Sequence, residues 1–446
     1  MHSTINRADQ IREVWTSDEN TMAQQTAASR WPKIVQGTID DIGKTATAAN
    51  EAQKLAESVA IQNSLKEIKN DMEQNKPLQT LPEDGGTDIK EYNTQLAVLG
   101  QCSWLNCPWL FGECYLRIQT IFAMSTHWKK HDVFKRQKDS TFANYRVAVE
   151  ELASRYIQVI AEPDTPKEDM KEEARKLLFT EMTEVALWGN ATDLSLLSHL
   201  SLEDLQNLQG REAISKSQRN IVDNDTDDVW LYLTRKSAQK DRRVDIVLDN
   251  AGFEFFTDLL YAAYLLDSGL ASCVKFHTKD FPWFVSDVVP EDVASLFDHL
   301  GSPSIFTNRQ HLDQLVTRLN RFFDSGTITV TSHPFWTTAY SFHEMPTKAQ
   351  DLFEDLQASY LVIFKGDLNY RKLTKDSLWP HTTSFREALG PLGESRIKIL
   401  ALRTNKSDTC VGVDSQHKVD ELNKEAPGGT WVRNGKYAVV SFSEGQ

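Results

Sequence analysis

Polar side chains follow four apolar runs in the second half of the chain, at the points where buried strands would end. Asp249 and Asn250 come directly after the run VDIVL, and Asp287 closes the segment DFPWFVSD. Asp367 and Lys406 lie in the segments GDLNYRK and RTNK, each of which follows another apolar run. Two or three carboxylates with an amide oxygen suit a hard divalent cation such as Mg²⁺ or Mn²⁺.

Cationic side chains occur in the same segments. Arg371 and Lys372 follow Asp367, and Arg403 precedes Lys406. Guanidinium and ammonium groups beside a metal ion suit a phosphate group, which Arg can bind through two parallel hydrogen bonds. A cation that polarises a phosphoryl oxygen, with positive side chains that neutralise developing charge, is the chemistry of metal-assisted phosphoryl transfer. A metal-assisted phosphate site is therefore one of two balanced interpretations.

The other interpretation is structural. Asp and Asn after a strand are common turn formers and helix caps. Glu254, one turn into the following helix, either complements the helix dipole or binds ligand hydroxyls. For His277 and His381 a structural role is favoured over acid–base catalysis. Acidic, amide and cationic side chains recur at four successive strand ends. This recurrence supports a metal-assisted phosphate site more strongly than any single residue does.

Six β-rich runs alternate with helical stretches from about residue 240 onward. They are VDIVL (244–248), SCVKFHT (272–278), TITVTS (327–332), YLVIFKG (360–366), RIKILAL (396–402) and YAVVSF (437–442). This alternation predicts βαβ units and a mostly parallel sheet covered by helices on both faces. Ligands bind such sheets at the carboxyl ends of the strands, which is where the polar clusters fall.

The first 240 residues are predicted to be mainly helical, because apolar residues recur there every three or four positions. An aromatic-rich helix is predicted over 104–122, and a capping box at 165–168 predicts the start of a helix that runs through Trp188. Residues 210–228 are polar and are predicted to form an exposed connection. We therefore predict an α/β fold with a mainly helical domain at 1–240 and an α/β catalytic domain at 241–446.

Composition limits the classes of partner and compartment. The formal net charge of −14 argues against nucleic acid as the main partner, since phosphate backbones demand a basic face. No apolar run approaches the roughly 20 residues of a membrane span. The first fifteen residues lack an apolar core of the kind a secretory signal has. The five Cys residues are scattered and odd in number, so we expect reduced thiols in a cytoplasmic or nuclear protein.

Several familiar enzyme motifs are missing from the sequence. There is no GxxxxGK[ST] loop, no GxGxxG after a strand and no GxSxG elbow. An aspartyl-phosphate enzyme would be expected to show Asp-x-Asp after its first strand, whereas Asp249 is followed by Asn250 and Ala251.

Six segments together resemble the damage-control phosphatase family, and specifically its third subfamily, which is also described as acidic-residue methyltransferase-like. These segments are LDNAGFE (248–254), PWFVSD (282–287), FKGDLNYRKL (364–373), RTNK (403–406), NCPWLFGECYLR (106–117) and LWGNATDLSLL (187–197). The resemblance spans most of the chain from about residue 30, and FKGDLNYRKL is its longest and most specific block.

The resemblance implies a helical N-terminal region packed on a three-layer α/β/α sandwich. It also implies a sugar-phosphate phosphatase, with substrates of the fructose 1-phosphate or fructose 6-phosphate type and activity supported by Mn²⁺, Co²⁺ or Ni²⁺. Carried over by position, the implied metal ligands are Asp249, Asn250 and Asp287. The implied substrate-binding residues are these three with Glu254, Asp367, Leu368, Asn369, Tyr370, Arg371 and Lys406.

The water that attacks phosphorus would be oriented or deprotonated by Asp249 or by Asp367, and the sequence leaves both open. Two other functions also stay open. The resemblance to the third subfamily also implies, as an alternative, an S-adenosylmethionine-dependent carboxyl methyltransferase that acts on protein glutamate. The sequence supports this activity poorly, because no Gly-rich loop that could bind the cofactor follows the first predicted strand. A non-catalytic scaffold, with the helical half as its partner-binding surface, is the third interpretation.

Overall fold

The architecture is that of a computed structural model, which describes residues 11–49, 51–83, 85–86, 88–116, 119–122, 125–161, 171–189, 218–235 and 241–446. The predicted capping box at 165–168, most of LWGNATDLSLL and residues 210–217 lie outside the described residues.

A seven-stranded sheet forms the centre of the molecule, with strand order β1-β7-β6-β5-β2-β3-β4. The strands are β1 (Ile221–Asn224), β2 (Arg243–Val247), β3 (Cys273–Thr278), β4 (Ile328–Ser332), β5 (Leu361–Lys365), β6 (Ile399–Thr404) and β7 (Ala438–Ser443). Neighbouring strands are parallel except β6 and β7, which are antiparallel. The predicted mostly parallel α/β sheet is confirmed.

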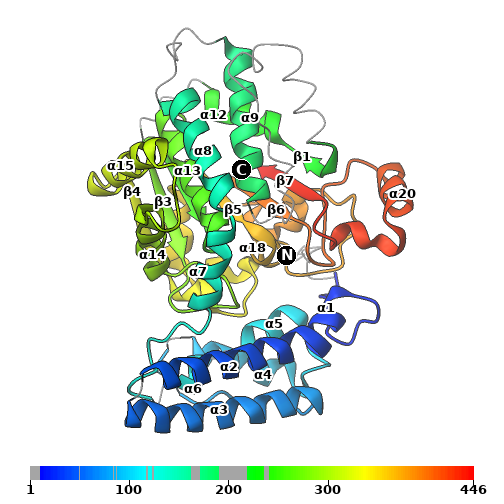
Figure 1. Cartoon of the computed structure of the whole chain (residues 1–446). Coiled ribbons are helices and arrows are strands. Elements are labelled where there is room, and N and C mark those ends of the chain that lie inside the picture. The colour runs from blue at the N-terminus through cyan, green and yellow to red at the C-terminus, as the bar shows by residue number, and fades with distance from the viewer. Residues whose placement is uncertain are drawn as a thin grey trace.

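Alternate residues of the central strands pack on opposite faces of the sheet, and this creates two apolar cores. Val244 and Ile246 of β2 and Ile363 of β5 belong to one core, whereas Val247 and Phe364 belong to the other. Every residue of β5 and β6 is buried, as expected for parallel strands covered on both sides. The result is a three-layer α/β/α sandwich (Figure 1).

Two sets of helices supply the outer layers. The first core contains residues of α8 (Arg146–Arg155), α9 (Glu172–Trp188), α12 (Thr226–Thr234), α13 (Phe253–Asp267), α14 (Pro290–Gly301) and α15 (Gln310–Asp324). The second contains residues of α16 (Met345–Lys348), α17 (Gln350–Gln357), α18 (Gly366–Leu373), α19 (Phe385–Ala388) and α20 (Gln416–Glu425). α13 is buried along almost its whole length, so it is the inner helix of its layer.

The N-terminal helices form a third core beside the sandwich (Figure 1). They are α1 (Met22–Gln25), α2 (Trp31–Ala49), α3 (Ala52–Glu73), α4 (Ile89–Leu99), α5 (Trp109–Tyr115) and α6 (Gln119–Phe122). Trp283, Ala339 and Leu368 belong to this third core although they lie in the sandwich part of the chain. We refer to residues 22–122 as the helical unit; α7 (Lys135–Asn144) follows it.

The structure differs from the sequence predictions at two local segments and divides the sandwich between the two predicted domains. The aromatic helix expected over 104–122 is interrupted, because α5 ends at Tyr115 and α6 begins at Gln119. The expected exposed connection includes β1, whose Ile221 and Val222 are buried against β7. α8, α9, α12 and β1 all precede residue 241 yet pack in the sandwich, so the sandwich draws on both predicted segments; the boundary at 240 as a division between folding units stays a prediction.

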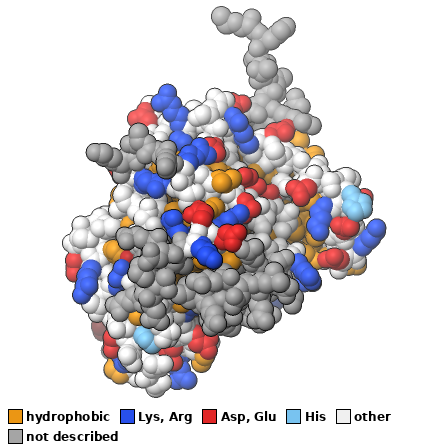
Figure 2. All heavy atoms as spheres, turned by 90° about the horizontal axis from the view of Figure 1, so that it is seen from above, with side chains coloured by type: hydrophobic (Ala, Val, Ile, Leu, Met, Phe, Trp, Pro, Cys, Tyr) orange, Lys and Arg blue, Asp and Glu red, His pale blue; other side chains and the backbone are white. Residues whose placement is uncertain are grey.

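The cysteines of the structure are free thiols, and its surface carries charges of both signs. Cys102, Cys107, Cys114 and Cys410 are buried free thiols, and burial raises the pKa of Cys107 to about 12. Among the helices that the structure describes, none combines the length and the apolar character needed to cross a bilayer. Seen from above, the described surface intersperses Lys and Arg with Asp and Glu (Figure 2).

Candidate functional site

The carboxyl ends of four parallel strands meet at one edge of the sheet. β5 pairs with both β2 and β6, and β2 pairs with β3, so the four strands that precede the predicted site residues are adjacent. The parallel register therefore brings together side chains that are up to 157 positions apart in sequence, from Asp249 to Lys406.

Asp249, Asn250 and Glu254 form a bonded group at the junction between β2 and α13. The Asn250 amide donates from Nδ2 to Asp249 Oδ2 at 2.6 Å and to Glu254 Oε2 at 2.8 Å. Both carboxylates are buried, with 7% and 4% of their residue surface exposed. Gly252, with φ of 76°, makes the turn from the strand end into α13. The amide thus holds two carboxylates close together in a place with little water.

Asp287 joins this group through the backbone. Residues 286–288 run antiparallel to 249–251: Ala251 N donates to Ser286 O at 2.6 Å, and Val288 N donates to Asp249 O at 2.9 Å. The Ser286 hydroxyl donates to Asn250 Oδ1. Asp287 is 3% exposed, and Lys279 Nζ lies 3.3 Å from its Oδ1. The structure therefore brings all three predicted metal ligands to one place.

Burial and like charge make these carboxylates hard to ionise on their own. The pKa of Asp249 is raised well above its usual range, first by burial and then by the charges of Glu254 and Asp287; the charges of Lys279 and Lys406 oppose the rise. Burial also raises the pKa of Asp287 to about 6, against the opposing charge of Lys279. A bound cation would relieve the repulsion, so this cluster is electrostatically suited to a positive ion.

Asp367 lies on the other side of Asp249, at the first turn of α18. Its Oδ1 accepts hydrogen bonds from Arg403 Nε at 2.7 Å, from the Lys406 backbone N–H at 3.0 Å and from the Ser407 hydroxyl at 3.0 Å. Gly366, with φ of 81°, lets α18 begin against Asp249, because a Cβ at this position would overlap the Asp249 carboxylate. β5 and β6 thus position Asp367 and Lys406 beside the acidic group.

The remaining predicted residues of α18 face other partners. Asn369 donates to the Lys365 and Leu248 carbonyls, at 2.8 and 3.2 Å, and so joins the ends of β5 and β2. Tyr370 is fully buried and accepts from Val411 N, and Leu368 packs in the core of the helical unit. In the structure these three residues position neighbouring elements.

Arg371 is buried between two carboxylates. Its Nε and Nη2 donate to Asp376 at 2.9 and 2.8 Å, its Nη1 donates to Glu113 of α5, and its guanidinium lies over the Trp109 ring. Contact with a substrate stays a prediction for Arg371, because the contacts that the structure shows join α18 to the helical unit.

Comparison with known proteins identifies the family. The family model described as "Damage-control phosphatase ARMT1-like domain" matches residues 26–422, which include all of the predicted site residues.

The chain belongs to the damage-control phosphatase ARMT1-like family.

Curated relatives in this family are similar over nearly the whole chain. A protein named "Damage-control phosphatase ARMT1" from Danio rerio is 35% identical over 447 residues, which cover 95% of each chain. The proteins of the same name from Mus musculus and Homo sapiens are each 31% identical over 446 residues, covering 95% of this chain and 97% of the relative. A solved DUF89 family protein from Pyrococcus horikoshii covers 96% of this chain and 99% of its own, at 14% identity and a TM-score of 0.43, a similarity too low to bear on the site.

The donor set of this ARMT1-like chain fits a hard divalent cation. Asp249, Asn250 and Asp287 offer carboxylate and amide oxygens, and Asp287 Oδ1 is buried with Lys279 Nζ 3.3 Å away. Among the described residues, no three or more His, Cys, Asp or Glu side chains are grouped to hold a metal ion. The predicted set is of a different kind, because its third ligand is an amide.

Three charged residues near this ARMT1-like site were not predicted. Lys279 follows β3, and its Nζ also donates to the Leu248 carbonyl at 3.1 Å. Lys365, the last residue of β5, is buried, and its Nζ lies 2.7 Å from Asp258 and 3.4 Å from Glu254. Both lysines stand at strand ends, so the rule that selected Asp249 would also have found them. Asp258 lies a turn beyond Glu254 on α13, where no strand-end signal applies.

A cavity of about 170 Å³ adjoins Asn250 and Glu254. Gln137, Thr141 and Tyr145, from α7 and its end, line its other side. The Tyr145 ring stacks on Phe253 with ring centroids 4.5 Å apart. The cavity therefore presents hydroxyl, amide and carboxylate groups next to the acidic cluster.

Proposed function

We propose that the chain is a metal-dependent phosphatase that hydrolyses phosphate monoesters of sugars, of the fructose 1-phosphate or fructose 6-phosphate type. The observation that carries this proposal is the meeting of Asp249, Asn250 and Asp287 at adjacent strand ends, with the positive charges of Lys279 and Lys406 beside them. Membership of a family named for damage-control phosphatases supports the same reaction class.

The cofactor in this proposal is a divalent cation held by Asp249, Asn250 and Asp287, with Mn²⁺, Co²⁺ or Ni²⁺ preferred and Mg²⁺ accepted. Such an ion supplies Lewis-acid polarisation of a phosphoryl oxygen. Lys406 and Lys279 neutralise negative charge on the phosphate, and Arg403 keeps Asp367 in place through its 2.7 Å hydrogen bond. A water molecule attacks phosphorus in line with the sugar oxygen; as the bond between phosphorus and that oxygen breaks, the sugar oxygen takes up a proton from solvent.

Asp367 is the proposed proton acceptor for that water. It is not one of the proposed ligands, and Arg403, Lys406 and Ser407 all donate to its Oδ1, so Oδ2 is the oxygen proposed to accept the proton. Asp249 is the alternative acceptor. The two differ in one testable respect, because Asp249 also holds the ion.

The organic part of the substrate is proposed to enter the 170 Å³ cavity beside Asn250 and Glu254. Glu254 accepts hydrogen bonds from sugar hydroxyls, and Gln137 and Thr141 contact the same hydroxyls from α7. The hydroxyl, amide and carboxylate groups that line this cavity suit the hydroxyl groups of a sugar. We expect the protein to act on cytoplasmic or nuclear metabolites, without nucleic acid or membrane partners.

The test is a screen of phosphorylated metabolites against a panel of divalent ions. The chelator-treated full chain is assayed for phosphate release with Mg²⁺, Mn²⁺, Co²⁺ or Ni²⁺ and with sugar phosphates that include both fructose esters. We expect ion-dependent release from ketose phosphates. The absence of release from every sugar phosphate with every ion would overturn the proposal.

A second measurement separates the methyltransferase alternative. Titration calorimetry with S-adenosylmethionine is expected to show no binding. Binding together with methylation of protein glutamate, and without phosphate release, would replace the phosphatase proposal with the methyltransferase one.

A further inference from the structure

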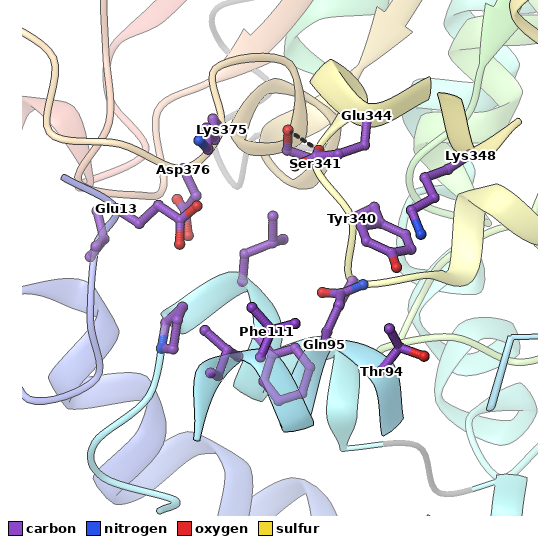
Figure 3. Close-up of a pocket in the computed structure, with 16 residues that line it drawn as sticks. Glu13, Thr94, Gln95, Phe111, Tyr340, Ser341, Glu344, Lys348, Lys375 and Asp376 are labelled. Atoms are coloured by element: carbon purple, nitrogen blue, oxygen red, sulfur yellow. Dashed lines mark hydrogen bonds between the residues drawn. The ribbon is translucent and has the colours of Figure 1, made fainter. Parts of the chain in front are cut away.

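A second cavity, of about 420 Å³, lies between the helical unit and the sandwich (Figure 3). Its lining comes from α4, α5 and the N-terminal segment on one side, and from residues 339–348 and 375–376 on the other. It shares no lining residue with the cavity beside Glu254. Asp376, which lines this second cavity, lies three residues beyond the end of α18, whereas Asp367 is at the first turn of that helix.

One side of this cavity is apolar. Leu110 and Phe111 of α5, together with Val98 and Leu99 at the end of α4, contribute most of this surface. Val98 is 83% exposed, the largest value among the exposed large hydrophobic side chains of the described chain. Ligand-binding cavities are lined mainly by apolar and aromatic side chains, as this side of the cavity is.

The other end of the cavity carries negative charge. The carboxylates of Glu13 and Asp376 point toward each other, and Glu344 lies above the cavity (Figure 3). Asp376 is paired with Arg371, and Glu344 accepts from the Ser341 hydroxyl at 2.7 Å. No hydrogen bond reaches the Glu13 side chain from any described residue, although Glu13 is half-buried.

Glu13 lies among charged groups of both signs. Burial raises the pKa of Glu13; the charge of Lys375 lowers it, and the charges of Asp376 and Glu344 have smaller effects that raise it. Lys348 also lines the cavity, but it is 3.2 Å from Glu91 and lies over the Tyr340 ring. A further polar group also lacks a partner within the described residues: Gln95 Nε2 is buried without an acceptor. The cavity thus presents a carboxylate that accepts no hydrogen bond from the described residues, with Lys375 nearby, and a buried amide N–H that lacks an acceptor within them.

We propose that this cavity binds a small organic cation, an ammonium group on an apolar body, with the ammonium against Glu13 and the apolar body against Phe111 and Val98. The cation removes the unfavourable proximity of Glu13 to Asp376 and Glu344. The apolar body covers the exposed side chain at the rim. This proposal does not depend on the phosphatase reaction, because it concerns other residues and binding alone.

The test measures binding of three probes of matched shape to the full chain near pH 7.5, where an alkylamine is protonated. The probes are 2-phenylethylamine, the neutral 2-phenylethanol and the anionic 3-phenylpropanoate. We expect saturable 1:1 binding of the amine, and binding at least about tenfold weaker for the alcohol and the acid. Equal binding of the amine and the alcohol, or no saturable binding of the amine, would overturn the proposal.

Matched variants locate the binding. Glu13→Gln keeps the shape of the side chain and is expected to weaken amine binding about tenfold or more, whereas Glu19→Gln, an exposed position on the same segment, is expected to have no effect. Val98→Lys places a positive charge at the rim and should also weaken binding; its control is Val147→Lys at an exposed position of α8. Unchanged amine binding in either cavity variant would overturn the assignment.

Discussion

Asp245 and Asp249 lie four residues apart in and after the same strand, and both are buried. Asp245, in the middle of β2, is fully enclosed and has three partners: Arg243 Nε at 2.8 Å, His277 Nε2 at 2.7 Å and the Ser359 hydroxyl. Asp249, at the strand end, receives one side-chain hydrogen bond within the described residues, from Asn250. Its nearest charged neighbours include two further carboxylates.

Asp245 and Asp249 differ in whether positively charged partners balance the carboxylate, and not in how deeply they are buried. A buried carboxylate with cationic partners stabilises the fold, and removing it leaves those partners unpaired. A buried carboxylate among other carboxylates costs free energy, and such a cost is typical of a site that binds a cation or performs acid–base chemistry. The comparison predicts opposite consequences for the same substitution at the two positions.

Asp249→Ala is expected to have the largest effect on activity. Loss of one group that contacts the reacting atoms commonly costs about 3 kcal/mol, and loss of a ligand costs at least this much, so turnover should fall by about 10²–10³-fold or more. The free energy of unfolding should stay the same or rise, because repulsion with Glu254 and Asp287 is removed. Phosphate release and chemical denaturation measure the two quantities.

The matched variant Asp367→Asn distinguishes the role of the ion from the role of the base. It should also lose turnover, yet it should keep the affinity for Mn²⁺ that Asp249→Ala loses, measured by calorimetry. If Asp249→Ala retained both Mn²⁺ binding and activity, the contrast with Asp245 would have no functional meaning.

Asp245→Ala is expected to have the largest effect on stability. It leaves His277 and Ser359 without their buried acceptor, and each unsatisfied buried polar group typically costs about 1–3 kcal/mol; Arg243 keeps its ion pair with Asp355 at 3.0 Å. The folded fraction should retain its turnover number, because the residue lies away from the strand ends. Denaturation curves with activity measured on the folded fraction test this expectation. A folded but inactive Asp245→Ala protein would place Asp245 in the reaction.

These two aspartates also mark the limit of what the sequence reveals. The strand-end rule found Asp249, Asp287 and Asp367, because a parallel sheet brings the ends of its strands to one edge whatever the side chains are. The same rule says nothing about Asp245, which interrupts an apolar run and depends on partners from β3 and from the turn before β5. His277 was expected to be structural, and its contact with Asp245 agrees with that expectation.

The other features that the sequence did not predict depend on contacts between segments that are far apart in the chain. The family resemblance implies that the segment containing Arg371 holds the substrate. In the structure, however, the guanidinium of Arg371 donates a hydrogen bond to Glu113, which lies 258 positions earlier in the chain. No local spacing encodes such a partner. β1 was missed because four residues with only two apolar side chains give too short a pattern, and the strand exists through its pairing with β7. The mostly parallel sheet was predictable because its central strands are continuous apolar runs.

Gly366→Ala tests whether the close packing of α18 on Asp249 is needed for activity. The added Cβ would overlap Asp249, and alanine is strained at φ of 81°, so we expect a loss of about 2–3 kcal/mol in the free energy of unfolding and at least about tenfold in turnover. Gly326→Ala is the matched control. It has φ of 70° and open space around it, so it carries the backbone strain alone and should keep full activity. Equal activity in the two variants would show that the packing of α18 on Asp249 does not matter.

The smallest expected effect tests whether a raised pKa is sufficient to mark a site. In β1, burial first and then Asp225 and Asp414 raise the pKa of Asp223 to about 8, and the Ser441 hydroxyl donates to its carboxylate. Asp223 is level with Val439 of β7 and, through it, with Arg403 of β6, but three strands separate β1 from β2, so Asp223 is remote from Asp249 along the sheet. We therefore expect Asp223→Asn to leave turnover unchanged.

The stability of the same variant should change with pH in a defined direction. Between about pH 4 and pH 8 the unfolded chain ionises this carboxyl while the folded chain keeps it protonated, so the free energy of unfolding falls as pH rises through that window. Asp223→Asn removes this contribution. The difference in unfolding free energy between pH 5 and pH 8 should shrink by about 1–3 kcal/mol relative to the parent chain, whereas the exposed control Asp324→Asn should leave it unchanged. A loss of turnover in well-folded Asp223→Asn protein would mean that Asp223 contributes to the reaction, and the distinction between Asp223 and Asp249 would fail.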